Sequence, residues 1–146
     1  MTVELYELDA PASAVYFLQW LLPLADSSAQ VGLSRGEDDP LPFWLVNILD
    51  ETDDPDCGTV EGLMSVSIFA PGPGNTAAFR ESRRTHRHML YLARHPLTDV
   101  AMPDGSIANL DYLTTSERPR LGQYRTDTVV RYVARYTYGF SFVPAI

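Results

Sequence analysis

Five arginines on one predicted helix are the residues whose spacing most clearly indicates a function. The segment from Thr76 to Arg94 follows a capping residue, Asn75, and ends before Pro96. At about 100° per residue, its basic residues share one sector of the helix, and they are Arg80, Arg83, Arg84, Arg87 and Arg94. The opposite sector is apolar or small and consists of Ala78, Ser82, Thr85, Met89 and Leu92, flanked by Phe79 and Leu90. The basic face predicts one of three roles: contact with nucleic-acid phosphates, docking on an acidic protein surface, or exposure to solvent.

The charge of the chain argues against sequence-specific DNA reading. The formal net charge is −8 at pH 7, and no recognised DNA-binding motif accompanies the arginines. Residues 1–74 carry thirteen acidic residues and one arginine, whereas residues 75–146 carry six acidic residues and ten arginines. This charge asymmetry predicts that the molecule binds copies of itself or an acidic partner. The alternative is that the two halves intermix in the fold and their charges cancel locally.

An acidic segment from Asp50 to Asp56 is the second candidate site, and its carboxylates are Asp50, Glu51, Asp53, Asp54 and Asp56. Part of it has the spacing of a calcium loop, but Pro55 stands where such a loop needs glycine, and the flanks read as strands. We therefore interpret the segment as a polar loop at the tip of a hairpin. Its carboxylates are expected to be solvated or to form a repulsive lining.

Other residues capable of chemistry do not form a catalytic or metal-binding pattern. His86 and His88 point to different sides of a helix, with no carboxylate or thiol at ligand spacing beside them. Cys57 lies next to aspartates, which would raise rather than lower the pKa of its thiol. There is no nucleophile elbow and no phosphate-binding loop. The sequence predicts no enzyme, no metal and no cofactor.

A long strand at the end of the chain is expected to organise the fold. Val129 to Phe142 alternates over fourteen residues, with Tyr132, Tyr136 and Tyr138 on one face. We expect that face to be core, and the face with Arg131 and Arg135 to be wet or in a subunit interface. The strand would cross the domain, bend at Gly139, or extend onto a neighbouring subunit.

Ala12 to Leu22 is predicted to be a first helix, and it is apolar almost all the way round. A helix of that kind needs cover on more than one side. In a domain this small, we expect another subunit to cover part of it, with Trp20 and Leu21 in the contact.

The predicted order of elements indicates an α+β fold with two helices packed on a mostly antiparallel sheet. Residues 1–146 form a single domain. Phe43–Leu49 and Thr59–Ala70 read as one hairpin, and Leu97–Met102 and Ile107–Thr115 as another around Asp104-Gly105. Ser116–Tyr124 reads as a loop. The acidic N-terminus shows no signal peptide, so we expect a cytoplasmic protein, at least when it is made.

This chain resembles the tail terminator proteins of long-tailed, non-contractile (siphovirus) phages. It is similar in particular to the terminators of actinobacterial phages. The resemblance is carried by Pro119–Phe142, where a loop with Gln123-Tyr124 leads into Val130-Arg131-Tyr132 and then Ala134-Arg135-Tyr136. It implies a structural virion protein, located at the neck end of the tail and in the host cytoplasm during assembly. Such proteins form a homohexameric ring that caps the tail tube, ends its growth and meets the head-side connector or head-completion protein. DNA passes through the lumen without specific binding.

Two alternatives remain open at this point. One is another head–tail connector or tail-completion ring protein. The other is a regulator that binds nucleic acid through the arginine-rich helix 76–94, which a steep dependence of binding on salt would reveal.

Overall fold

Two long antiparallel strands, β3 (Thr59–Pro71) and β6 (Val129–Val143), form the centre of the fold. The computed structural model describes residues 29–54, 59–95, 98–101, 107–122 and 128–143. Within them, β2 (Phe43–Asp54) pairs with β3, and β5 (Ile107–Gly122) pairs with the other side of β6. The short strands β1 (Gln30–Gly32) and β4 (Thr98–Ala101) complete a six-stranded sheet in the order β1-β2-β3-β6-β5-β4. Every pairing is antiparallel except that of β1 with β2, so the expected mostly antiparallel sheet is confirmed.

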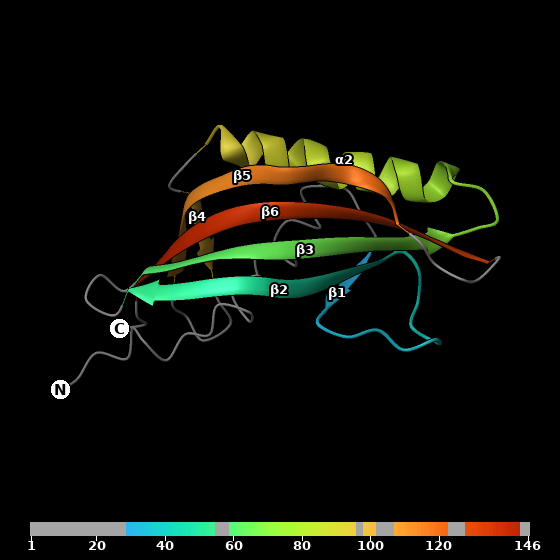
Figure 1. Cartoon of the computed structure of the whole chain (residues 1–146), viewed down its shortest axis with the longest axis horizontal. Coiled ribbons are helices and arrows are strands. Elements are labelled where there is room, and N and C mark those ends of the chain that lie inside the picture. Colours follow the sequence, from blue (N-terminus) through green and yellow to red (C-terminus); the bar gives the residue numbers. More distant parts are fainter. Residues whose placement is uncertain (1–28, 55–58, 96–97, 102–106, 123–127, 144–146) are drawn as a thin grey trace.

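One helix, α2 (Thr76–Ala93), lies along the β5 side of the sheet (Figure 1). Asn75 occupies its N-cap position, but the Asn75 side chain makes no capping hydrogen bond. The molecule is thus a single-domain α+β fold with a helix packed on a mixed sheet. The predicted first helix, Ala12–Leu22, lies outside the described residues.

The core lies between α2 and the sheet face that α2 covers. The alternation of β6 places Ala134, Tyr136, Tyr138 and Phe140 on this face, and all four are buried. Trp44 and Val66 come from the neighbouring strands, and Met89 and Leu92 come from the helix. The predicted core face of the terminal strand is confirmed at these positions, while Tyr132 is only partly buried at the margin of the cluster.

The terminal strand is a central strand that pairs with its own chain on both sides. Its pairing continues past Gly139, as far as Ser141 with β3 and as far as Val143 with β5. The irregularity lies instead in β5, between Leu110 and Tyr112, and the Tyr112 ring occupies the space beside Gly139. A Cβ at Gly139 would lie 2.4 Å from Tyr112 Cε1, so the glycine is needed for this close approach.

Two predicted loops are strands in the structure. The first five residues of the acidic segment, Asp50 to Asp54, continue β2 and pair with Leu63 to Thr59. Ser116 to Gly122 continues β5, although the segment contains Pro119. Register shifts between Thr115 and Arg120 accommodate the proline in the ladder with β6. In both cases the composition predicted a loop, but a long partner strand supplies the pairing that local propensity does not favour.

Candidate functional site

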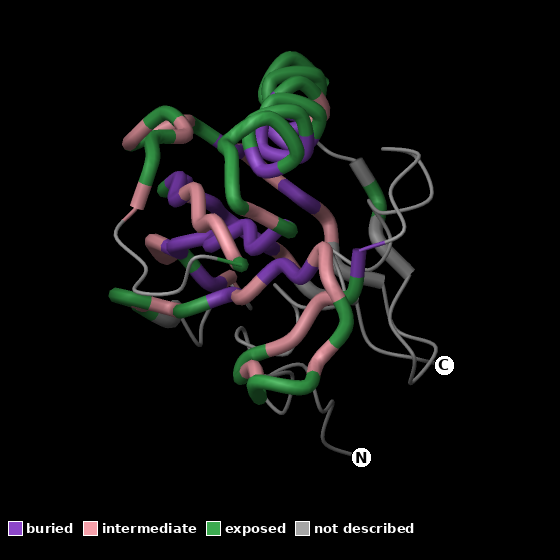
Figure 2. Tube along the Cα trace, turned by 90° about the vertical axis from the view of Figure 1, so that its right-hand side faces the viewer, coloured by how far each residue is buried: buried purple, intermediate pink, exposed green. Residues whose placement is uncertain are grey.

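The most distinctive surface is the side of α2 that faces away from the sheet. All five arginines predicted to share this side are exposed: Arg80, Arg83, Arg84, Arg87 and Arg94. Figure 2 shows the helix end-on, with its buried positions toward the sheet and its exposed positions outward. The amphipathic helix predicted from the sequence is confirmed, with Ala78, Ser82, Thr85, Met89 and Leu92 buried against the sheet.

Large apolar side chains lie among these arginines, which the sequence did not predict. Phe79, Leu90 and Tyr91 are 48%, 45% and 58% exposed. The Arg83 guanidinium lies over the Phe79 ring, 5.5 Å from its centroid, within the roughly 6 Å at which a cation and an aromatic ring attract each other. Arginine combined with exposed aromatic residues is the composition enriched at protein–protein interfaces. The only signal in the sequence was that Phe79 and Leu90 flank the apolar sector.

Glu81 is the acidic residue of α2, and it faces the core instead of the surface. It is 7% exposed, and its Oε1 accepts a hydrogen bond of 3.2 Å from the indole Nε1 of Trp44. Its other oxygen, Oε2, lies 3.6 Å from Arg84 Nη1. Helix α2 therefore exposes no acidic side chain, and Glu81 ties the helix to β2.

The two arginines predicted on the second face of β6 have different surroundings. Arg131 is half-buried and donates from Nε and Nη2 to the Ser67 hydroxyl at 3.2 and 3.1 Å. Arg135 is exposed, and its Nε lies 3.4 Å from Glu117 Oε2. A hydrogen bond from Arg120 holds the pKa of Glu117 below its usual value, with the charges of Arg120 and Arg135 acting in the same direction. Part of this face is not exposed to solvent, since Ser67, Phe69 and Val133 are buried. The predicted solvent exposure therefore fits Arg135 better than Arg131.

Among the described side chains, those at the acidic end of β2 lie away from the arginines of α2. Asp50 is exposed, and Glu51 Oε2 accepts a hydrogen bond of 3.1 Å from the Tyr138 hydroxyl. Asp53 and Asp54 belong to β2, but their side chains, like all of Asp56, lie outside the described part of the chain. Figure 1 shows α2 along β5 and the end of β2 at the opposite margin of the sheet.

A second acidic group lies in the connection between β1 and β2. Glu37 and Asp38 are exposed at the tip of a turn that Gly36 and Asp39 close. Asp39 N donates to Gly36 O at 3.2 Å, and Gly36 N donates to Asp39 Oδ2 at 2.6 Å. Arg35, just before the turn, lies over the Phe69 ring at 5.0 Å from its centroid and anchors the connection to β3. The turn is thus held in a defined shape.

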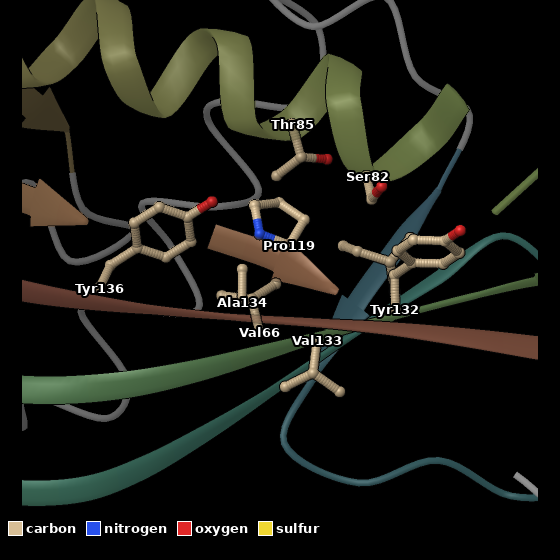
Figure 3. Close-up of a pocket in the computed structure, with 9 residues that line it drawn as sticks. Val66, Ser82, Thr85, Pro119, Tyr132, Val133, Ala134 and Tyr136 are labelled. Carbon is tan, nitrogen blue, oxygen red and sulfur yellow. The ribbon is translucent and has the colours of Figure 1, made fainter. Parts of the chain in front are cut away.

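A narrow crevice between α2 and the sheet provides no site for a reaction. In Figure 3, Ser82 and Thr85 of the helix face Tyr132, Ala134 and Tyr136 of β6 across it, while Val133 points to the other side of the strand. The crevice has no room for a water molecule. The hydroxyls of Ser82 and Thr85 donate to the carbonyls of Phe79 and Glu81 in their own helix. These polar groups therefore satisfy local structure.

Within the described residues, no group of three or more histidine, cysteine, aspartate or glutamate side chains could hold a metal ion. In the same part of the chain, no helix is long and apolar enough to span a membrane. Trp20 and Leu21, predicted to lie in a subunit contact, fall outside the described ranges. Comparison of the chain with protein-family models and with curated proteins finds no match. The surfaces described above are therefore the basis for a functional assignment.

Proposed function

We propose that this protein is a structural virion subunit that caps a phage tail tube as a homo-oligomeric ring, ends tube growth and joins the tail to the head-side connector. The observation that carries the proposal is the separation of charge across the subunit. Helix α2 lies along β5 with its basic, partly apolar side facing outward, whereas exposed carboxylates lie at the β1–β2 margin (Figure 1). Unlike surfaces on opposite margins make head-to-tail contacts, and such contacts form a ring when the rotation closes.

The resemblance of Pro119–Phe142 to tail terminators supports the same proposal and supplies the partners. These are further copies of the chain in a homohexamer, the tail tube protein and the head-side connector or head-completion protein. The site of action is the neck end of the virion tail, and assembly takes place in the host cytoplasm. The proposed role needs no catalytic residue and no cofactor.

In the proposed ring, the acidic end of the β2–β3 hairpin faces the lumen or an axial partner. DNA that leaves the head must slide through the channel, and a negative wall repels its phosphates. A basic wall would instead hold DNA by releasing counterions. We therefore place the α2 arginines away from the lumen. A structure of the assembled ring with those arginines lining the channel would contradict this placement.

The function is tested by adding the purified chain to growing tail tubes. We expect an assembly with about six times the 16.3 kDa mass of one chain at one end of each tube, and tubes of uniform length in electron micrographs. Tubes that elongate past a bound ring would identify another connector or tail-completion protein instead. Binding to random-sequence DNA with a steep salt dependence, and none to tubes, would favour a nucleic-acid-binding regulator that uses α2.

A further inference from the structure

The outer side of α2 has two properties of a protein-binding surface. It exposes the apolar side chains Phe79, Leu90 and Tyr91 between arginines, and its acidic residue, Glu81, is buried. Arginine and aromatic residues are enriched among the side chains that contribute most to the binding energy of protein interfaces. A surface that only had to stay in solution would not expose three large apolar groups on one helix. The excess of positive charge on this side favours an acidic partner.

The turn Gly36–Asp39, which we call the acidic turn, has the complementary properties. Its tip exposes the adjacent carboxylates Glu37 and Asp38, and Leu33 beside it is 50% exposed. Two hydrogen bonds between Gly36 and Asp39 close the turn. A surface that is already ordered before binding loses little conformational entropy in the complex.

These two surfaces cannot meet within one subunit. The acidic turn connects β1 to β2 at one margin of the sheet, and α2 lies along β5 toward the other margin (Figures 1 and 2). Strands β3 and β6 separate β2 from β5. A second copy of the chain, however, can present its acidic turn to the helix of the first.

We infer that the outer side of α2 binds the acidic turn of a second copy, an inference that rests on the proposed ring and assigns its subunit contact. Arg80 and Arg87 are two helical turns apart, about 10.5 Å along the axis, so Glu37 and Asp38 fit between them. Phe79 and Leu33 supply apolar area beside the charges. The contact joins two different surfaces, so each subunit uses its helix toward one neighbour and its turn toward the next.

The test reverses the charges of the two surfaces separately and then together. One variant carries Arg80→Glu and Arg87→Glu, a second carries Glu37→Arg and Asp38→Arg, and a third carries all four changes. The fourfold variant keeps the formal net charge of −8 and is the matched control for charge and composition. Self-association is measured by sedimentation at about 50 mM salt, where the Debye length exceeds the ~10 Å found at 0.1 M. Circular dichroism checks that each variant is folded.

We expect each twofold variant to self-associate at least about tenfold more weakly than the natural chain, because like charges then face each other. An equimolar mixture of the two variants should associate again, since each helix then meets a turn of opposite charge. The fourfold variant should also associate. Folded twofold variants that associate like the natural chain, or a mixture and a fourfold variant that both stay monomeric, would overturn the inference.

The tail-tube assay separates this inference from the proposed function. If the natural chain caps tubes and the twofold variants still associate, the proposed function holds and the subunits use another contact. If the twofold variants lose association, their mixture and the fourfold variant regain it, and the natural chain does not bind tubes, the inferred contact exists but the function is a different one. A natural chain that stays monomeric at its highest soluble concentration overturns the inference, and the capping result then decides the function alone.

Discussion

Tyr136 and His86 form the buried polar contact between β6 and α2. The Tyr136 hydroxyl lies 2.9 Å from His86 Nδ1, and both residues are almost fully buried. Burial raises the pKa of Tyr136, so its hydroxyl keeps the proton. Burial also lowers the pKa of His86, and the positive charges of Arg118 and Arg83 lower it further. A neutral imidazole can accept a hydrogen bond at Nδ1 from the Tyr136 hydroxyl, which pairs these two atoms.

The lowered pKa of His86 predicts a pH dependence of stability. The folded protein resists protonation of His86, whereas the unfolded chain binds a proton near the ordinary pKa of 6.5. The stabilisation is therefore complete above that value and decreases as the pH falls through it. We expect the free energy of unfolding to fall less between about pH 7.5 and about pH 5.5 in His86→Gln than in the natural protein. His88→Gln, on the same helix, is the control for replacing a histidine, because the His88 ring contacts the Arg84 carbonyl of its own helix.

Truncation of Tyr136 tests whether its face of β6 is core. Tyr136 is 1% exposed, so Tyr136→Ala should lower the free energy of unfolding by about 3–5 kcal/mol, the range for removal of a large buried side chain. Arg131→Ala removes a partly exposed side chain from the other face and should cost less. Denaturant unfolding of both variants measures the difference. Equal losses would show that the two faces of β6 are packed alike.

At the scale of elements, the sheet depends on glycines that let aromatic rings lie against the backbone. A Cβ at Gly62 would come 2.6 Å from the Tyr138 hydroxyl, which donates across that position to Glu51 of β2. Gly139 has the same relation to the Tyr112 ring on β5. The rings thus cover places where the sheet has no side chain, and they connect β6 with strands on both of its sides.

Gly139→Ala tests this arrangement. The added methyl group overlaps the Tyr112 ring, so the ring or the β5 irregularity beside it must move. We expect thermal or denaturant unfolding to show a loss of about 1–3 kcal/mol, the usual cost of overpacking. Gly74→Ala is the matched control, because no atom lies within 4 Å of the methyl group it would add. A neutral Gly139→Ala variant would mean that Tyr112 has room to turn away.

At the scale of the whole molecule, one long sheet carries two oppositely charged margins. The helix covers one face on the β5 side, and the acidic turn lies at the β1–β2 margin (Figure 1). A subunit of this kind is suited to repeated head-to-tail contact. The proposed ring also needs cover for the apolar segment Ala12–Leu22, which lies outside the described residues.

Trp20→Glu tests that second contact. The sequence of this segment is apolar almost all the way round a helix, so we expect a neighbouring subunit to cover Trp20, and a charge there should weaken ring formation and tail capping. Sedimentation and the tail-length assay measure the two effects, and Leu21→Glu provides an independent variant. A folded Trp20→Glu protein that caps tails normally would show that no subunit contact depends on this position.

The sequence alone determined those elements whose local pattern of apolar and polar residues matches their burial in the fold. The alternation of Val129–Phe142 predicted the central strand, and the arginine spacing predicted α2 together with its basic outer side. Both hairpins followed from short apolar runs around turn residues, and their pairing is confirmed. Period and polarity suffice for α2, which buries one side and exposes the other, and for β6, whose aromatic face is core while its second face carries the arginines.

Only the tertiary structure decided where strands end and which parts of α2 remain exposed. Pro119 and the aspartates of Asp50–Asp54 predicted loops, yet β6 and β3 extend the ladder through both segments, because backbone pairing with a long neighbour outweighs local propensity. Phe79 and Leu90 belong to the margin of the apolar sector, and their exposure depends on how much of the helix the sheet covers. The separation of the acidic turn from α2 likewise follows from strand order, which brings together or keeps apart residues distant in the chain.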